Sequence, residues 1–217
     1  MGKKFAVILS GCGFQDGAEI QESVCTLLAI ERAGGTYSCF APDIDQHHVT
    51  NHLSSQASEG ETRNVLVESA RIARGAIKPL SEFKASDFDA LVLPGGFGGA
   101  LNLSTFAING PDCTVNADVE KAIKSVAAAG KPIGSLCITP AIMAKVLGEV
   151  ELTIGNDKGT AEALEKLGAK HKETTFGEIV VDKTHKLVTA PCYMLDSKVS
   201  TIADEAQKVV NAVLEMA

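Results

Sequence analysis

An apolar strand runs directly into a helix in the stretch Gly134-Ser135-Leu136-Cys137-Ile138-Thr139-Pro140-Ala141. Such a nucleophile elbow presents one side chain at its apex and needs small residues two positions to either side, because the sharp turn brings those two together. Ser135 and Thr139 stand at these positions around Cys137. Pro140 suits the first turn of the helix, where its missing N–H is not needed. We therefore expect Cys137 to be the reactive centre, with its thiol pKa lowered by the helix dipole.

Strand-length apolar runs alternate with helical stretches along the chain on both sides of this elbow. Predicted strands cover Phe5–Leu9, Tyr37–Ala41, Ala90–Leu93, Pro132–Leu136, Leu152–Ile154 and a hairpin of Glu178–Val181 with Lys186–Thr189. Predicted helices cover Ala18–Ala33, Arg63–Arg74, Val115–Ala129, Pro140–Leu147, Ala161–Leu167 and Val199–Met216. The first helix is predicted because Ile20, Val24, Leu27, Leu28 and Ile30 recur at helical spacing before Gly34-Gly35. The pattern predicts a single α/β domain over residues 1–217, with a mostly parallel, doubly wound, flavodoxin-like sheet.

In parallel sheets of this kind the functional residues lie just after the carboxyl ends of the strands. Besides the elbow, two other segments follow predicted strands and carry candidate functional residues. The first is Leu93-Pro94-Gly95-Gly96-Phe97-Gly98-Gly99, whose backbone N–H groups at Gly95 and Gly96, with that of Ile138, are suited to an oxyanion hole. The second is Asp16-Gly17-Ala18-Glu19, whose Glu19 carboxylate is suited to proton transfer with the thiol.

The composition limits the classes of partner. The chain has 45% hydrophobic and 22% charged residues and a net charge of -7, which is typical of a globular protein and unfavourable for nucleic acid or an anionic membrane. No apolar run approaches the length of a membrane span. Six scattered cysteines without a leader pattern predict a reducing compartment, the cytoplasm or, as a mature form, the mitochondrion. His47, His48 and His52 lack a partner motif, so no metal site is predicted.

These motifs resemble the DJ-1/PfpI superfamily in their order: Glu after the first strand, Pro-Gly-Gly, then Cys with Pro three residues later. The blocks Ser10-Gly11-Cys12-Gly13, Asp16-Gly17-Ala18-Glu19, Glu61-Thr62-Arg63-Asn64-Val65, Pro94-Gly95-Gly96-Phe97-Gly98 and Tyr193-Met194-Leu195 are similar to one branch, the glyoxalase ElbB/ES1 family. The resemblance implies a homodimer and a cofactor-free conversion of glyoxal to glycolate, with deglycase-like activity as a related possibility. It assigns Cys137 as nucleophile and Glu19 as acid/base.

Some residues depart from the family pattern. Leu101 stands where the branch usually has Lys, and Thr139 where it usually has Ala. Ile138 follows the cysteine where PfpI-type peptidases carry His, and no His lies in Pro191–Asp196, where an amidotransferase places one. The peptidase and glutaminase interpretations therefore lack a general base.

Three alternatives remain open from the sequence. Besides the enzyme, Cys137 is suited to a redox sensor or stress-related binding protein without turnover, or the elbow is idle, which predicts ordinary backbone angles at Cys137. Further residues at strand ends are candidates for the pocket, with packing or surface roles as the alternative: Cys12, Arg63, Asn102, Pro191, Cys192 and Tyr193.

Overall fold

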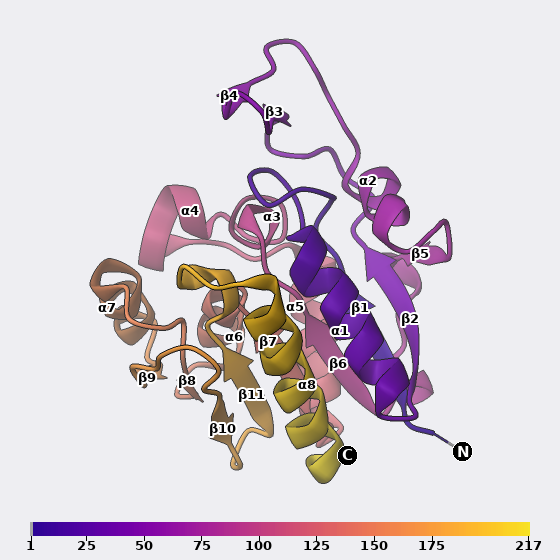
Figure 1. Cartoon of the computed structure of the whole chain (residues 1–217), viewed down its shortest axis with the longest axis vertical. Coiled ribbons are helices and arrows are strands. Elements are labelled where there is room, and N and C mark those ends of the chain that lie inside the picture. The colour runs from indigo at the N-terminus through magenta and orange to yellow at the C-terminus, as the bar shows by residue number, and fades with distance from the viewer. Residues whose placement is uncertain (1) are drawn as a thin grey trace.

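The central sheet has seven strands in the order β10-β11-β7-β6-β1-β2-β5 (Figure 1) in the computed structural model, which describes residues 2–217. Every neighbouring pair is parallel except β10 with β11. The strands are β1 (Lys4–Ile8), β2 (Thr36–Ala41), β5 (Ile77–Pro79), β6 (Ala90–Leu93), β7 (Ile133–Leu136), β10 (Val180–Asp182) and β11 (Leu187–Ala190). The predicted mostly parallel α/β fold is confirmed. The parallel order places the carboxyl ends of β1, β6, β7 and β11 side by side.

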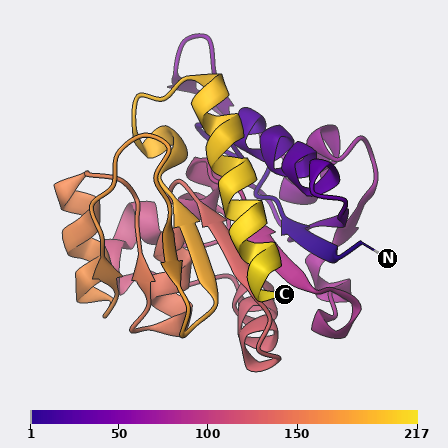
Figure 2. The same ribbon diagram turned by 60° about the horizontal axis from the view of Figure 1, so that its bottom comes forward.

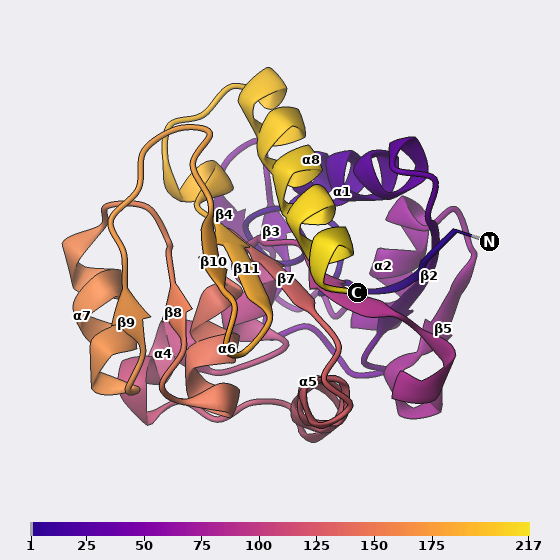
Figure 3. The ribbon, with the colours of Figure 1, turned by 90° about the horizontal axis from the view of Figure 1, so that it is seen from below.

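Helices cover both faces of the sheet (Figures 2 and 3). On one face α1 (Ile20–Arg32) and α8 (Val199–Met216) bury Ile30 and Val209 in a core with Val7 and Val92 of the strands. On the other face α5 (Ala117–Ala128) and α6 (Pro140–Leu147) pack Ile123 and Met143 against Ile8 and Leu91. No helix among residues 2–217 is long and apolar enough to cross a membrane.

Helix α1 leaves part of its apolar pattern exposed to solvent. Ile20, Val24 and Leu28 form an exposed stripe, with 44%, 49% and 39% of their surface accessible. The buried face instead carries three polar side chains beside its apolar residues, and its members are Glu22, Ser23, Thr26, Leu27, Ala29 and Ile30. Of the five apolar residues whose spacing predicted this helix, Leu27 and Ile30 are buried there. A carboxylate on the buried face of a helix requires specific partners.

A long excursion between β2 and α2 (Val65–Ile72) contains a hairpin that the sequence pattern did not predict. Its strands, β3 (Thr50–Asn51) and β4 (Gln56–Ala57), are only two residues each and are largely exposed. They project from the edge of the molecule at which the parallel strands end (Figure 1).

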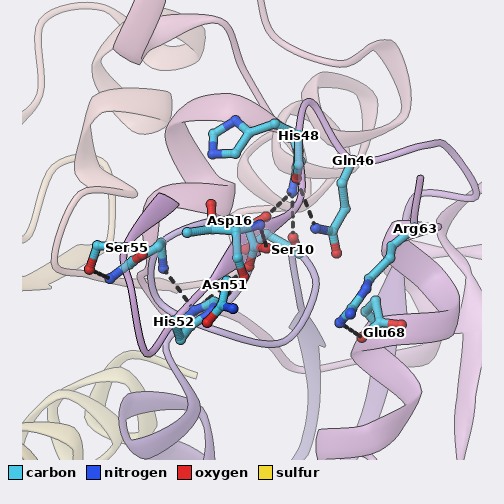
Figure 4. Close-up of polar contacts among 12 residues, drawn as sticks. Ser10, Asp16, Gln46, His48, Asn51, His52, Ser55, Arg63 and Glu68 are labelled. Carbon is cyan, nitrogen blue, oxygen red and sulfur yellow. Dashed lines mark hydrogen bonds and ion pairs between the residues drawn. The ribbon is translucent and has the colours of Figure 1, made fainter. Parts of the chain in front are cut away.

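Polar contacts join this hairpin to the loop that follows β1 (Figure 4). Asp16 Oδ2 accepts a hydrogen bond from the Thr50 backbone N–H at 2.7 Å, and His52 Nε2 accepts one from the Gln15 N–H at 3.3 Å. The His52 ring also meets the ring of Phe14 edge-on, with centroids 5.6 Å apart. The hairpin therefore holds the loop that bears Phe14.

The remaining elements are short. They are α3 (Phe97–Leu101), α4 (Phe106–Asn109), β8 (Glu151–Leu152), α7 (Lys158–Lys166), β9 (Lys170–His171) and the 3-10 turns η1 (Leu80–Glu82), η2 (Ala85–Asp87), η3 (Gly110–Asp112) and η4 (Cys192–Met194). Strands β8 and β9 pair in parallel as a separate small sheet. His171 is part of strand β9.

Candidate active site

Cys137 lies at the apex of a sharp turn between β7 and α6. Its φ angle is +59°, a left-handed conformation that is strained for a residue with a side chain. The hydroxyls of Ser135 and Thr139 meet across the turn at 2.8 Å, so the two small residues approach as predicted. Thr139 Oγ1 also donates to the Leu93 carbonyl at 3.0 Å, which links the elbow to the end of β6. The predicted elbow geometry is confirmed. The alternative of an idle elbow predicted ordinary backbone angles at Cys137, and these are not observed.

The glycine loop after β6 packs directly against the elbow. A Cβ atom at Gly95 would lie 2.2 Å from Cys137 Cβ and 2.5 Å from Glu22 Oε2. Such contacts are far inside van der Waals distance, so position 95 admits only glycine in this geometry. Gly96 has a φ of +100°, and a Cβ there would meet the backbone N of Glu19 at 2.3 Å. The loop is therefore close-packed between the elbow and the start of α1.

The carboxylate beside the thiol belongs to Glu22. Its side chain is fully buried. Oε2 accepts a hydrogen bond from the Gly95 N–H at 2.9 Å, and Oε1 accepts one from the Tyr193 N–H at 3.1 Å. The thiol of Cys137 lies beside the same carboxyl group, since a Cβ atom at Gly95 would meet both Glu22 Oε2 and Cys137 Sγ within 3.0 Å. Glu22 thus connects α1, the glycine loop, the elbow and the turn after β11.

Glu19 was predicted to be this partner, and the structure corrects that prediction. Its Oε2 accepts a hydrogen bond from the Glu22 N–H at 2.6 Å, so it caps the amino end of α1. Capping satisfies an N–H that would otherwise lack a partner at the first turn. Glu22 follows by three residues and points into the core. The apolar pattern of the helix gave no signal for it, because the buried face on which Glu22 lies also carries the polar residue Thr26.

The pair of Cys137 and Glu22 is electrostatically unusual. Burial, followed by the nearby Glu19 charge and in spite of the hydrogen bonds from Tyr193 and Gly95, raises the pKa of Glu22 to about 8. Burial, and then the adjacent Glu22, raise the pKa of the Cys137 thiol well above its usual value. The predicted lowering of the thiol pKa by the helix dipole is therefore wrong. Two acidic groups in contact within a dry site resist carrying two charges at once.

Two backbone N–H groups near the sulfur act against burial and Glu22 and lower the pKa of the Cys137 thiol. Gly96 and Ile138 hydrogen-bond Cys137 Sγ and favour the thiolate. Both were predicted to form an oxyanion hole, and both lie beside the reactive atom. Gly95, predicted to join them, does not, because its N–H is already used by Glu22.

A cleft of about 790 Å³ opens above the thiol. It is lined by Phe14, Glu19, Gln21, Gly96, Phe97, Cys137, Ile138, Asp157, Thr160, Tyr193, Met194, Leu195 and Asp196. Tyr193, a predicted pocket residue, is among them, and its hydroxyl donates a hydrogen bond to Gln21 Oε1. Pro191, which was also predicted to belong to the pocket, does not line the cleft and instead precedes η4. Among the described residues that line the cleft there is no histidine, lysine or arginine.

The other predicted pocket residues lie elsewhere. Cys12 lines a second groove of about 480 Å³ with the exposed stripe of α1 and Arg71, so it does not share a site with Cys137. Arg63 is exposed and pairs with Glu61 at 3.3 Å and Glu68 at 3.7 Å. Neither residue contributes to the cleft.

Asn102 does not line the cleft and has a structural role instead. Its buried side chain donates hydrogen bonds to the carbonyls of Ser10 at 2.9 Å and Asp16 at 2.8 Å, and accepts one from the His47 N–H. It therefore shapes the loop after β1. Leu101, the departure from the family lysine, is also outside the cleft lining.

Cys192 is fully buried behind the cleft. Burial, followed by the charges of Glu22, Glu205 and Cys137, raises its pKa well above the usual value. Its backbone N–H donates to Glu205 Oε2 at 2.8 Å, and its φ is +46°. This anchored turn places the N–H of the next residue, Tyr193, on Glu22.

The histidines of the excursion do not gather into a metal-binding cluster. The His47 and His48 rings meet edge-on, and His52 faces Asp16 at 3.8 Å. Within residues 2–217 no three His, Cys, Asp or Glu side chains lie close enough to hold a metal ion.

Comparison with known proteins identifies the family. No family model matches the chain. It is 47% identical to the human glutamine amidotransferase-like class 1 domain-containing protein 3, mitochondrial, over 98% of this chain and 83% of that protein. It is 46% identical to the rat ES1 protein homolog, mitochondrial, over 98% of this chain and 84% of that protein. The chain belongs to the ES1 family.

Solved structures agree with membership of the ES1 family. A crystal structure from Ehrlichia chaffeensis, described as an isoprenoid biosynthesis protein with an amidotransferase-like domain, has a TM-score of 0.91 and 33% identity, covering 99% of this chain and all of that one. Drosophila melanogaster DJ-1beta has a TM-score of 0.59 and 21% identity, and so shares the fold. The ES1 relatives from human and rat are mitochondrial by name, whereas the sequence favoured the cytoplasm.

Proposed function

We propose that this protein is a cofactor-independent, glyoxalase-type enzyme in which Cys137 is the nucleophile and Glu22 the proton-transfer group. One observation carries the proposal: the fully buried carboxyl of Glu22, whose pKa is raised to about 8, lies beside the thiol at the floor of a cleft. An acid whose pKa lies near the working pH both takes and returns a proton readily. With no imidazole among the described lining residues, Glu22 is the group placed for that role.

The first step joins the thiol to glyoxal. The thiol proton passes to the Glu22 carboxylate as the sulfur forms a bond to one carbonyl carbon. The carbonyl oxygen becomes an oxyanion and takes up that proton, giving a hemithioacetal. The backbone N–H groups of Gly96 and Ile138, which meet the sulfur, are placed beside this oxygen as well.

The second step moves hydrogen between the two carbons. Glu22 removes the proton from the carbon bonded to sulfur, and an enediol forms. Return of a proton to the second carbon yields a hydroxyacetyl thioester. Water then attacks the thioester carbon, the sulfur leaves and regains its proton, and glycolate is released. The overall change is glyoxal plus water to glycolate plus a proton, with no external oxidant or reductant.

Glyoxal consumption by the purified protein, with glycolate quantified by proton NMR, tests the proposal. Cys137→Ala removes the nucleophile and is expected to abolish turnover. Cys25→Ala, at a half-buried position of α1 outside the cleft, is the matched control and is expected to keep wild-type activity. Turnover that persists in Cys137→Ala, or wild-type protein that produces no glycolate while Cys137 is a free thiol, contradicts the proposal.

A redox-sensing or binding role without turnover is the second candidate. Its support is the contact between one oxidisable thiol and one carboxyl. However, peroxide attacks the thiolate, and the raised pKa of Cys137 disfavours that form at neutral pH. The second candidate predicts that mild peroxide oxidises Cys137 before the other five cysteines. Uniform oxidation of all six counts against it.

Two broader properties belong to the same proposal. The names of the ES1 relatives support a mitochondrial location over a cytoplasmic one.

A homodimer is supported by the exposed apolar stripe of Ile20, Val24 and Leu28 on α1, because contiguous apolar surface favours association. Sedimentation of the wild type beside Val24→Glu tests the dimer, which the added charge is expected to weaken.

A further inference from the structure

The cleft above Cys137 is much larger than glyoxal requires. Its volume of about 790 Å³ lies in the range of sites that hold drug-sized ligands, roughly 300–1,000 Å³. Glyoxal has only two carbons and two oxygens. If turnover takes place at Cys137, most of the cleft would stay empty with that substrate. A larger carbonyl compound would use the volume.

The walls of the cleft are aromatic and aliphatic. Phe14 and Phe97 both line the cleft and have 47% and 52% of their surfaces exposed, so they offer apolar surface side by side for a ligand to cover. Their loops are joined, because the Phe97 N–H donates to the Phe14 carbonyl at 2.8 Å. Tyr193 and Met194 complete the apolar wall. An apolar or aromatic part of a ligand would lie against these side chains.

The ionisable side chains at the mouth of the cleft are all acidic. They are Glu19, Asp157 and Asp196, and the described lining contains no basic residue to neutralise them. Asp157 caps α7 by accepting a hydrogen bond from the Thr160 N–H at 2.8 Å, and the Thr160 side chain, followed by that N–H, lowers the pKa of the Asp157 carboxyl. Carboxylates of one sign around an apolar cleft repel anions and attract cations, and aromatic faces also favour cations.

We propose that the cleft selects carbonyl compounds that carry a positive charge and an apolar part, such as an aldehyde bearing an ammonium group, over anionic ones. Asp157 and Asp196 are the residues that determine this selectivity. The inference rests on the proposed function only in taking Cys137 as the group that meets the carbonyl carbon. It does not depend on Glu22 or on completion of a catalytic cycle.

An isosteric pair of aldehydes separates charge from shape. Trimethylammonioacetaldehyde and 3,3-dimethylbutanal differ in having N⁺ or carbon at the branched centre. Each adds reversibly to the thiol and protects it from iodoacetamide, and the protecting concentration is read from the Cys137 peptide by mass spectrometry. Glyoxylate serves as the anionic probe.

The cation preference is the protecting concentration of the neutral aldehyde divided by that of the cationic one. The readout is the change in this ratio between protein variants, because the intrinsic reactivities of the two aldehydes then cancel. The test variant is Asp157→Asn with Asp196→Asn. Asparagine is an equally good helix cap, so α7 should stay intact. The control with the same charge change is Asp87→Asn with Glu215→Gln, two exposed positions on η2 and at the end of α8 that are outside the cleft lining.

We expect the cation preference to fall about tenfold in the cleft variant at low salt and to stay within about twofold in the control. Protection by glyoxylate should improve in the cleft variant. Equal preferences in the wild type and both variants would overturn the charge selection, even if glyoxal is consumed. Conversely, a charge preference without turnover would leave this inference standing and contradict the proposed enzyme.

Discussion

The backbone N–H of Tyr193 donates a hydrogen bond to Glu22 Oε1 at 3.1 Å, although 171 residues separate the two in the chain. The other carboxylate oxygen accepts the N–H of Gly95 from the middle of the chain. The partner of Cys137 is therefore oriented by one segment from the middle of the chain and one from near its carboxyl end. The pKa of Glu22 is raised only in the folded protein, so the ionisation of the group that is proposed to transfer the proton also affects the stability of the fold.

The stability of the protein should depend on the ionisation of Glu22. Its pKa rises from 4.5 to about 8 on folding, so the protonated form is favoured in the folded state. That contribution is complete below pH 4.5 and is lost as the pH rises through 8. It amounts to about 5 kcal/mol at about 1.4 kcal/mol per pH unit. Urea denaturation from pH 5 to 9 should show the wild type losing stability.

Glu22→Gln should flatten this pH dependence, because glutamine does not ionise. At low pH the variant should be less stable by about 1–3 kcal/mol, since one of the two backbone donors loses its acceptor. Glu19→Gln is the comparison variant: it removes the neighbouring charge that helps raise the pKa of Glu22, but it should keep most of the wild-type slope because burial is the larger cause. Parallel curves for wild type and Glu22→Gln would show that the carboxyl does not titrate in this range.

The thiol of Cys137 should react as a weak acid. Burial and Glu22 raise its pKa, so the rate of alkylation by iodoacetamide should climb through pH 9 without a plateau in the neutral range. Removing the acidic neighbour in Glu22→Gln should shift the profile to lower pH. The rate at the Cys137 peptide is read by mass spectrometry. A wild-type plateau below pH 7 would instead mean that the helix terminus and the two N–H groups outweigh burial.

Gly95→Ala should disrupt the site. The added methyl group would overlap Cys137 Cβ at 2.2 Å, and overpacking of this kind costs at least about 2–3 kcal/mol. Thermal unfolding and glyoxal turnover should both be impaired. Gly159→Ala on α7 is the control, because a Cβ there meets only Asp157 Oδ1 at an ordinary 3.7 Å. Normal activity of Gly95→Ala would contradict the close packing of the loop on the elbow.

His52→Ala should affect binding more than chemistry. His52 supports the Phe14 loop through the ring contact and the Gln15 hydrogen bond, and Phe14 forms part of the cleft wall. Loss of about 1 kcal/mol would raise KM roughly fivefold, with kcat little changed. The pH profile of Cys137 alkylation should stay the same. His47→Ala at an exposed position is the control, and equal effects of both substitutions would contradict the positioning role.

The fold and the elbow could be predicted because their determinants are local. Ser135, Cys137 and Thr139 are close in sequence, and the alternation of strands and helices fixes the carboxyl edge of the sheet. Glu22 could not be chosen over Glu19 by local pattern, since both lie at the start of one helix. Its role depends on N–H groups of Gly95 and Tyr193, which only the folded chain brings to it.

Other differences have the same origin. Cys12 follows β1 as predicted, but it lines a second groove with Arg71 and the apolar stripe of α1 instead of the cleft at Cys137. The apolar residues of that stripe helped to predict the helix, although the side chains that actually enter the core include Glu22 and Thr26. Hydrophobic spacing alone does not distinguish a face that meets the sheet from one that is left exposed.

The most direct test of the central claim compares glycolate formation by Glu22→Gln and Glu19→Gln, each normalised to the fraction of folded protein with a free Cys137 thiol. General acid–base catalysis by a placed group contributes roughly 10²–10⁴-fold, so Glu22→Gln should lose at least about a hundredfold in kcat while Glu19→Gln stays within about fivefold. A hundredfold loss in Glu19→Gln, with Glu22→Gln near wild type, would contradict the account and assign proton transfer to the helix cap.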